Sequence, residues 1–460
     1  MIPERLRPLV DETEGLARLF AGAGFRLYLV GGVVRDALVG RLRESADLDF
    51  TTDARPDDVE RLVEGWADAL WTQGKRFGTI GILSGGRRME ITTHRAEAYH
   101  ADSRKPAVMF AEAVEADLSR RDFTVNAMAL SLPGLALIDP FDGVGDLAAG
   151  RLRTPLRAPE SFADDPLRML RAARFIAGYG LAPDPDVVEA VGNMRSRLEI
   201  VSGERVRDEL DKLIVVDEPG EGLRFLVRTG LAEEFLPELP ALALEQDRAH
   251  RHKDVLAHTI AVVDATSPER LLRLAALFHD VGKPKTRSFG PRGTVTFHHH
   301  EAVGARMTRD RMRALRYSAG DVETVSGLVD MHLRFHTYRM GWTDSAVRRY
   351  VRDAGPLLDR LNELTRCDCT TRNVAKARAL SLRMDELEER IAVLRQQEAL
   401  DAIRPDLDGN AVMERLGIAP GRAVGEALAY LLELRLEEGP LGAEEAGRRL
   451  GTWWAGRTQA

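Results

Sequence analysis

Two glycines and two aspartates near the start of the chain have the residue types and spacing for phosphate chemistry. Gly31 and Gly32 follow the apolar run at 27–30, and Asp47 and Asp49 lie on the next strand-like segment. Glycines let the backbone turn tightly and approach a ligand, and a helix beginning after the turn points free amide groups at a phosphate. Carboxylates two residues apart on a strand face the same side. Such a pair suits Mg²⁺, which commonly binds one or two carboxylates together with substrate phosphates.

The elements that must position these residues are short strands and amphipathic helices. The apolar spacing predicts the following helices and strands: helix 4–22, strand 27–30, a helix from about 33, a strand carrying Asp47 and Asp49, helix 57–69, and strands 77–84 and 88–93 joined at Gly85-Gly86. Glu90 on the last strand could join the two aspartates as a third carboxylate. Its spacing permits this role without requiring it.

The joint pattern Gly31-Gly-x-x-Arg35-Asp, then D-x-D, then Thr-Thr resembles the polymerase-beta-type nucleotidyltransferases. More narrowly, it is similar to the class II tRNA nucleotidyltransferases (CCA-adding enzymes) and the bacterial poly(A) polymerases. The resemblance implies two-metal nucleotidyl transfer, with Asp47 and Asp49 holding Mg²⁺ and activating an RNA 3′-hydroxyl. It also implies that Gly31, Gly32 and Arg35 help to seat a nucleoside triphosphate.

A second motif lies at residues 120–127, Arg-Arg-Asp-Phe-Thr-Val-Asn-Ala. Adjacent arginines can grip a triphosphate through forked donors. The stretch resembles the family's second motif, which implies nucleotide and sugar contacts for Arg121, Asp122 and Asn126. Upstream, residues 97–105 are expected to form a mobile loop.

A third motif, Asp164-Asp165-Pro-Leu-Arg168, with Arg171 one turn later, resembles the family's base-recognition motif. A carboxylate only accepts hydrogen bonds and a guanidinium only donates them. Together they complement an amino group beside a ring acceptor, which cytosine and adenine offer and uracil and guanine do not. An Asp165–Arg168 pair would therefore accept CTP and ATP, at a cost of about 1–3 kcal/mol per mismatched contact for other bases.

A possible second site lies in the body of the chain. His258, then His279-Asp280, then Asp368 follow the H…HD…D pattern of HD-type metal phosphohydrolases, and the run at 279–286 is a specific match. Histidine nitrogens and carboxylate oxygens can hold a divalent metal that activates water. Family resemblance adds His300 and His332. The sequence leaves open whether this site is active, on which substrate and with which metal.

Composition narrows the class of protein. The chain has 460 residues, 44% hydrophobic and 30% charged, which predicts an ordinary soluble protein of roughly two to four domains. Two cysteines, Cys367 and Cys369, cannot build a disulfide framework, so we expect a reducing cytoplasm. No apolar run approaches the ~20 residues of a membrane span. The net charge of −7 argues mildly against a nucleic-acid partner, although phosphate contacts depend on where basic residues lie.

These patterns predict an α+β protein. We expect a polymerase-beta-type nucleotidyltransferase head at 1–146, with a small mixed sheet and helices, followed by an all-helical body. The body would comprise a helical neck with the base-recognition motif at 147–250, an HD domain at 251–380 and a helical tail at 381–460.

The function that the resemblance implies is addition of CCA to tRNA 3′ ends from CTP and ATP, with Mg²⁺ and a second divalent metal in the HD domain. The expected partner is the tRNA acceptor arm, with no membrane; the oligomeric state is not readable. Alternatives are a poly(A) polymerase, an enzyme that adds only A to tRNA, an HD-type phosphohydrolase, and a non-catalytic RNA-binding protein.

Overall fold

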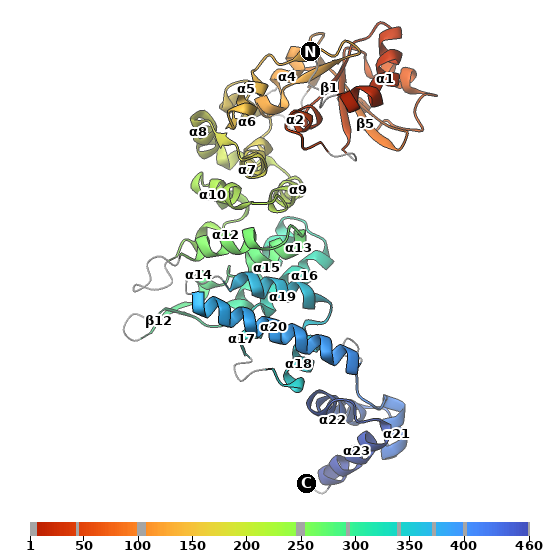
Figure 1. Cartoon of the computed structure of the whole chain (residues 1–460), viewed down its shortest axis with the longest axis vertical. Coiled ribbons are helices and arrows are strands. Elements are labelled where there is room, and N and C mark those ends of the chain that lie inside the picture. Colours follow the sequence, from red (N-terminus) through yellow and green to blue (C-terminus); the bar gives the residue numbers. More distant parts are fainter. Residues whose placement is uncertain are drawn as a thin grey trace. The chain divides into compact units, whose positions relative to one another are not determined.

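The computed structural model describes residues 7–42, 46–98, 107–244, 254–290, 295–337, 342–369, 374–398 and 403–458. The chain divides into two compact units, Met1–Pro237 (unit 1) and Glu238–Ala460 (unit 2). Strands of the main sheet belong to unit 1, and unit 2 is almost entirely helical (Figure 1). The expected α+β head followed by a helical body is confirmed.

Unit 1 is built around a mixed sheet, seven-stranded within the described residues, in the order β3-β4-β5-β2-β1-β8-β9. Its strands are β1 Leu27–Val30, β2 Leu48–Thr52, β3 Ala69–Trp71, β4 Thr79–Ser84, β5 Arg87–Thr93, β8 Ala129–Leu132 and β9 Leu137–Ile138. Only β2 and β5 pair in parallel among these neighbours. Two further pairs are the antiparallel β6 Arg95–Ala98 with β7 Ala107–Phe110, and the parallel β10 Arg151–Leu152 with β11 Ala182–Pro183.

The two faces of the sheet carry different residues because side chains alternate along each strand. Leu48 and Phe50 of β2 point into the main core with Leu29 and Ile91. Asp49, between them, is exposed on the other face. There, a smaller cluster that includes Val30 of β1 and Leu118 of the helix α4 (Val114–Ser119) covers part of the sheet. The alternation therefore places the aspartates on a face that is only partly covered.

Helices complete unit 1. They are α1 Arg7–Gly22, α2 Gly32–Leu38, α3 Pro56–Val63, α4 Val114–Ser119, α5 Gly143–Ala148, α6 Ala158–Asp164, α7 Leu167–Tyr179, α8 Pro185–Met194, α9 Gly203–Ile214, α10 Gly220–Arg228 and α11 Ala232–Phe235, with 3-10 turns η2 Lys75–Phe77, η3 Thr124–Asn126 and η4 Arg195–Ile200. In α7, the spacing of three puts Arg168, Arg171 and Arg174 on one face, while residues such as Leu170 and Ala173 are buried. Ser202 caps α9 by accepting from the Arg205 amide.

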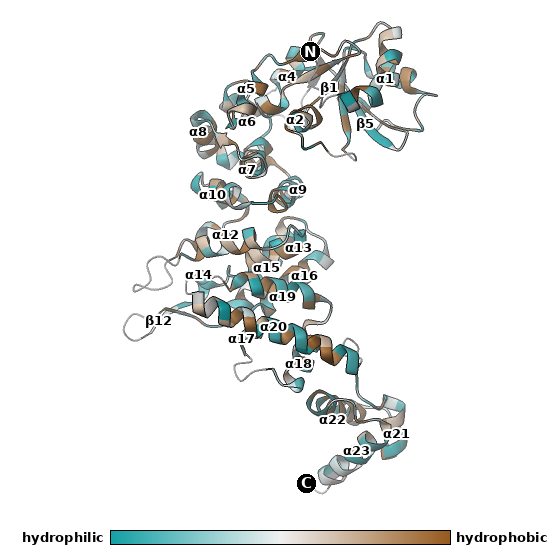
Figure 2. Ribbon diagram, in the orientation of Figure 1, coloured by the Kyte–Doolittle hydropathy of each residue, from teal (hydrophilic) through white to brown (hydrophobic). Residues whose placement is uncertain are grey.

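Unit 2 contains the histidine-rich region and the C-terminal helices. Its elements are η5 Pro240–Leu242, α12 Val255–Ala265, α13 Arg270–Phe278, α14 Lys283–Thr286, β12 Arg287–Phe289, β13 Val295–Phe297, α15 His300–Ala314, α16 Ala319–Met331, α17 Arg334–Thr337, α18 Asp344–Ala354, η8 Gly355–Leu357, α19 Leu358–Asp368, α20 Val374–Gln397, α21 Gly409–Leu416, α22 Arg422–Glu438 and α23 Ala443–Thr458. Hydrophilic and hydrophobic residues alternate along α20, as Figure 2 shows. The last three helices pack around a separate core that includes Val412, Leu431 and Leu450.

Several local expectations need correction or lie outside the description. The helix expected at 57–69 ends at Val63, and Ala69 already begins β3, so the apolar residues near 69–71 serve a strand. Of the expected mobile loop at 97–105, only the end of β6 is described. The boundary expected at residue 146 falls inside unit 1, and the four-domain division stays a prediction. Among the described helices, none is long and apolar enough to cross a membrane.

Candidate functional site

The glycine turn lies between β1 and α2, and its geometry requires glycine. Gly31 has φ 80°, a left-handed conformation that side chains disfavour. A Cβ on Gly31 would lie 3.0 Å from a guanidinium nitrogen of Arg121 and 3.8 Å from Oδ2 of Asp49. The turn therefore brings backbone, a cation and a carboxylate together.

Three carboxylates share the open face of the sheet beside this turn. Asp49 pairs with Val30 on one side and with Glu90 on the other, in the parallel register of β2 and β5. Loss of surrounding water raises the pKa of Asp49, Arg121 opposes the rise, and Glu90 and Asp47 add to it. Negative groups that hinder one another's ionisation fit a site for a divalent cation. The register thus brings Glu90 to the aspartates, which the sequence alone left open.

The 120–127 motif is tied to α7 through Asp122. The Arg171 guanidinium donates to Asp122 Oδ2 with its Nε at 2.8 Å and with a second nitrogen, and Asn126 donates to Asp122 Oδ1 at 2.9 Å. Although burial opposes ionisation, Arg171 and Asn126 lower the pKa of Asp122 to about 2. Asp122 is therefore a fixed anion that connects the 120–127 motif to α7.

Arg35 is buried, and each of its three side-chain nitrogens donates inside the protein. Its Nε donates to Asp36 Oδ1 at 2.9 Å, one terminal nitrogen donates to Asn126 Oδ1, and the other donates to the Tyr179 hydroxyl. The guanidinium carbon also lies 4.2 Å from the centre of the Tyr179 ring. With 5% of its surface exposed, Arg35 holds Asn126 in place.

Asp165 and Arg168 are expected to read a base together. Among the described contacts, their side chains bond to other partners and not to each other. Asp165 Oδ2 accepts from Arg205 at 2.8 Å, and Oδ1 accepts from the Leu167 amide at 3.1 Å. Arg168 donates to Ser161 and to the Arg120 carbonyl. The reason is geometric: Asp165 precedes the first turn of α7, and Arg205 on α9 packs against that end. Both residues lie at the start of α7, and Arg168 contacts the first residue of the 120–127 motif.

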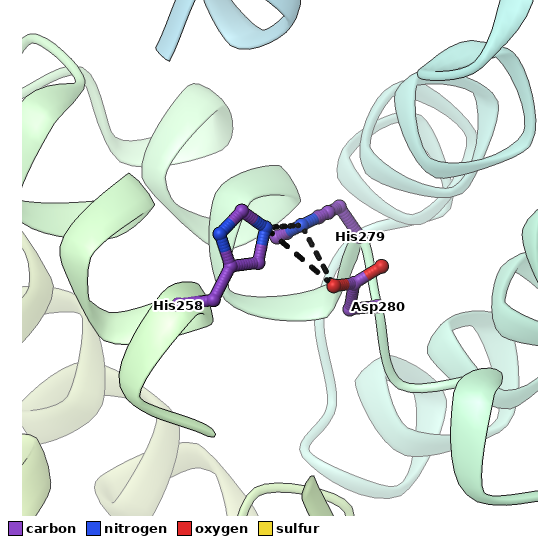
Figure 3. A group of neighbouring side chains, drawn as sticks. All are labelled: His258, His279 and Asp280. Atoms are coloured by element: carbon purple, nitrogen blue, oxygen red, sulfur yellow. Dashed lines mark hydrogen bonds and ion pairs between the residues drawn. The ribbon is translucent and has the colours of Figure 1, made fainter. Parts of the chain in front are cut away.

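The histidine-rich region of unit 2 forms a compact cluster of ligand atoms. Two groups, His258–His279–Asp280 and Asp280–His300–His332, each have ligand atoms within 4.8 Å of one another, and Asp280 belongs to both. Figure 3 shows the first group converging. The fourth expected ligand, Asp368, lies 2.9 Å from His258 Nε2. All the residues expected at this site therefore come together.

The histidines are oriented as metal ligands are. In His279, His300 and His332, Nδ1 donates to a backbone carbonyl at 2.7, 2.8 and 2.7 Å respectively, which leaves Nε2 facing the cluster. Such outer hydrogen bonds fix ring orientation in metal sites. Although burial opposes protonation, Asp280 and Asp368 raise the pKa of His279 to about 10. The imidazole nitrogens and carboxylate oxygens of the cluster form a donor set that fits a divalent metal.

Sequence reasoning missed three residues at these sites. Arg205 lies in α9, for which no part in the site was predicted. Lys283 donates to Asp280 Oδ2 at 2.6 Å, and the motif at 279–286 contains it without indicating this contact. Tyr179 has no signal at all, since its partners Arg35 and Asp36 lie more than 140 residues earlier.

Comparison with known families agrees with this division of sites. Residues 27–153 match the poly(A) polymerase head domain, 180–242 a probable RNA and SrmB-binding site of polymerase A, and 249–391 the HD domain.

Among curated relatives, the chain is 34% identical over 449 residues to an A-adding tRNA nucleotidyltransferase of Deinococcus radiodurans, covering 94% of this chain and 96% of that one. It is 34% identical over 446 residues to a CC-adding tRNA nucleotidyltransferase of Thermus thermophilus, covering 94% of each. A CCA-adding enzyme of Bacillus subtilis is 40% identical over 219 residues, covering 47% of this chain and 53% of that one.

Solved structures share the fold at lower identity. The CCA-adding enzyme of Bacillus stearothermophilus in complex with CTP aligns with a TM-score of 0.69 and 23% identity over 100% of both chains. The CCA-adding enzyme of Thermotoga maritima, complexed with tRNA, aligns with a TM-score of 0.60 and 19% identity over 98% of this chain and 97% of that one.

Proposed function

This chain belongs to the family of tRNA nucleotidyltransferases and bacterial poly(A) polymerases, and on that premise we propose that it adds C, C and A to tRNA 3′ ends from CTP and ATP. The observation that carries the proposal is the carboxylate face of Asp47, Asp49 and Glu90 beside the Gly31 turn, with Arg121 close to the turn and acting electrostatically on Asp49. A phosphate-binding turn opposite a metal-binding carboxylate group suits transfer of a nucleotidyl group.

In this proposal each part of the site has a role. Asp47 and Asp49 hold Mg²⁺, which supplies positive charge to the reacting phosphoryl oxygens when bound. Arg121 contacts the triphosphate, and Asp122 and Asn126 contact the nucleotide. Arg35 acts through Asn126, because the guanidinium is buried and each of its three nitrogens already donates inside the protein.

Base choice falls to Asp165 and Arg168. Each carboxylate oxygen has two acceptor positions, so Asp165 can bind Arg205 and a base amino group together. A base with a carbonyl oxygen at that place would leave the carboxylate facing an acceptor. This supports selection of C and A over U and G. The helices that follow would hold the acceptor arm by its shape and backbone.

The test is incorporation of each labelled NTP, singly and in mixtures, onto a tRNA transcript lacking CCA, with Mg²⁺. Growth by three nucleotides that requires only CTP and ATP, and then stops, is the expected result. An unbounded ladder with ATP alone would identify a poly(A) polymerase instead. A single A added only to tRNA ending in CC, or only C residues added, would identify one half of a divided system such as the two full-length relatives represent.

A second activity, metal-dependent phosphate-ester hydrolysis, is favoured by the two ligand groups that share Asp280. A divalent metal bound there would polarise a phosphoryl oxygen and a water molecule. The histidines and Asp280 would hold the metal, and Lys283 beside Asp280 would supply a cation for a phosphate group.

Matched variants separate the two activities. Asp49→Asn should abolish nucleotide incorporation and leave phosphate release from a generic phosphoester intact. His279→Ala should do the reverse and lower the metal content of the purified protein. Phosphate release that survives in His279→Ala at the wild-type rate would refute the second activity.

A further inference from the structure

Tyr179 is the last residue of α7, the helix that begins just after Asp165, and it joins this helix to the glycine-turn helix α2. Its hydroxyl accepts from Arg35 and donates to Asp36 Oδ1 at 2.8 Å. Its ring lies against the Arg35 guanidinium, 4.2 Å from ring centre to guanidinium carbon. On the same turn of α7, Arg41 donates to the Gly178 carbonyl at 2.7 Å. Four separate contacts therefore tie the end of α7 to the segment that carries the turn.

The other polar anchors of α7 lead elsewhere. Arg168 and Arg171 bind the 120–126 segment, through the Arg120 carbonyl and Asp122. The hydrogen bonds at the Tyr179 end link α7 directly to the helix that follows Gly31, and the Arg35 guanidinium also lies 5.2 Å from the ring centre of Phe175, one turn earlier. The hydroxyl is suited to this role because burial raises the pKa of Tyr179, which keeps its proton available to Asp36.

We propose that Tyr179, through Arg35 and Asp36, is a positioning residue that sets the base-reading end of α7 relative to the glycine turn and so determines nucleotide selectivity. This inference rests on the proposed nucleotidyl transfer. It assigns a role to a residue that touches neither base nor phosphate.

Helix α7 is long enough that a small tilt at Tyr179 would displace the Asp165 end appreciably. Thirteen residues of α7 span about 18 Å at ~1.5 Å per residue. A tilt of about 5° at Tyr179 would move the Asp165 end by about 1.6 Å, and errors of about 1 Å in reacting geometry can cost two orders of magnitude in rate. The correct nucleotide uses the base contacts and loses rate when they are misplaced. A nucleotide that never makes those contacts loses little, so selectivity falls.

Tyr179→Phe tests the proposal, since it keeps the ring against Arg35 and removes only the hydroxyl. We expect the ratio of kcat/KM for CTP to that for UTP, on tRNA lacking CCA, to fall about 3- to 10-fold, as for loss of a single hydrogen bond. Tyr350→Phe is the matched control, because Tyr350 of unit 2 also donates from a buried hydroxyl, to Asn362 at 2.8 Å. It should lower Tm and leave the ratio unchanged.

A double variant adds a second criterion. Asp36→Ala should reduce the same ratio, and Tyr179→Phe combined with Asp36→Ala should be no worse than the more impaired single variant, because both break one connection. The proposal is overturned if Tyr179→Phe lowers Tm without changing the ratio, if Tyr350→Phe changes the ratio equally, or if the two effects multiply. If the wild-type protein incorporates no nucleotide, the proposed function itself fails and this inference fails with it.

Discussion

Replacing Asp122 by asparagine should destabilise unit 1 at neutral pH and should do so much less in acid. Asp122 is 7% exposed and bound by Arg171 through two nitrogens and by Asn126. Asparagine keeps the shape of the side chain and removes its charge. The variant therefore isolates the electrostatic part of the connection between the 120–127 motif and α7.

The magnitude follows from the shift in pKa. Despite burial, Arg171 and Asn126 lower the pKa of Asp122 from 3.8 to about 2, which corresponds to about 2 kcal/mol of folding free energy. Because the folded pKa lies below the unfolded one, this contribution is complete well above pH 4. It is lost as pH falls toward the folded pKa, with about half gone near pH 3.

The assay is urea unfolding of the wild-type protein and of Asp122→Asn, monitored by circular dichroism and repeated at a series of pH values from 7 to 3. The difference in unfolding free energy should be about 2 kcal/mol at pH 7 and should narrow steadily below pH 4. Asp385→Asn, which removes an exposed partner of Arg366, is the control and should change stability by less than about 0.5 kcal/mol. A difference between wild type and Asp122→Asn that stays constant across this pH range would refute the reasoning.

Three further outcomes are expected. Glu90→Gln should raise the Mg²⁺ concentration needed for half-maximal incorporation by about tenfold, since one carboxylate beside Asp49 is lost; an unchanged Mg²⁺ titration would exclude Glu90 from the site. Gly31→Ala should cost about 1–2 kcal/mol in urea unfolding and at least tenfold in kcat, because its φ of 80° is left-handed and its Cβ would meet Arg121; wild-type stability and kcat would contradict this. Glu398→Gln should cost about 3 kcal/mol, because it leaves the buried Arg348 and Arg435 without their shared carboxylate; a loss below about 0.5 kcal/mol would argue against the buried network.

The glycine turn, the position of the aspartates on a strand and the start of a helix could be predicted from the sequence, because each depends on residues close together in the chain. Gly31 and Gly32 mark the turn between an apolar strand and a helix, and the two-residue spacing of Asp47 and Asp49 places both on one face whatever the rest of the chain does. Ser202 predicts the start of α9, since the cap bonds an amide three residues later. Where the local signal was ambiguous, at residues 57–69, the prediction extended a helix into a strand.

The histidine cluster was also foreseeable, for a different reason. His279 and Asp280 are adjacent in the sequence, and few arrangements other than a metal site bring such residues together with His258 and Asp368. The orientation of the rings was not foreseeable, because it depends on hydrogen bonds from Nδ1 to backbone carbonyls that exist only once the helices end where they do.

The pairing of charged side chains was decided by tertiary structure alone. Arg171 follows Asp122 by 49 residues and Arg35 precedes Asn126 by 91. Sequence spacing fixes the face of a helix on which an arginine lies, but the partner is whichever acceptor the packed neighbour presents, and a long side chain reaches several. For this reason Asp165 binds Arg205 on another helix.

The same limit applies to Glu90 and Tyr179. The sequence determined that Glu90 lies on a strand, and only the parallel register of β2 and β5 placed it beside Asp49. The sequence carries no signal for Tyr179, and only the packing of α7 on α2 brought its hydroxyl to Asp36. Local geometry depends on neighbours in the chain, so the spacing of residue types predicts it. Contacts across the fold depend on how whole elements pack, which no short pattern specifies.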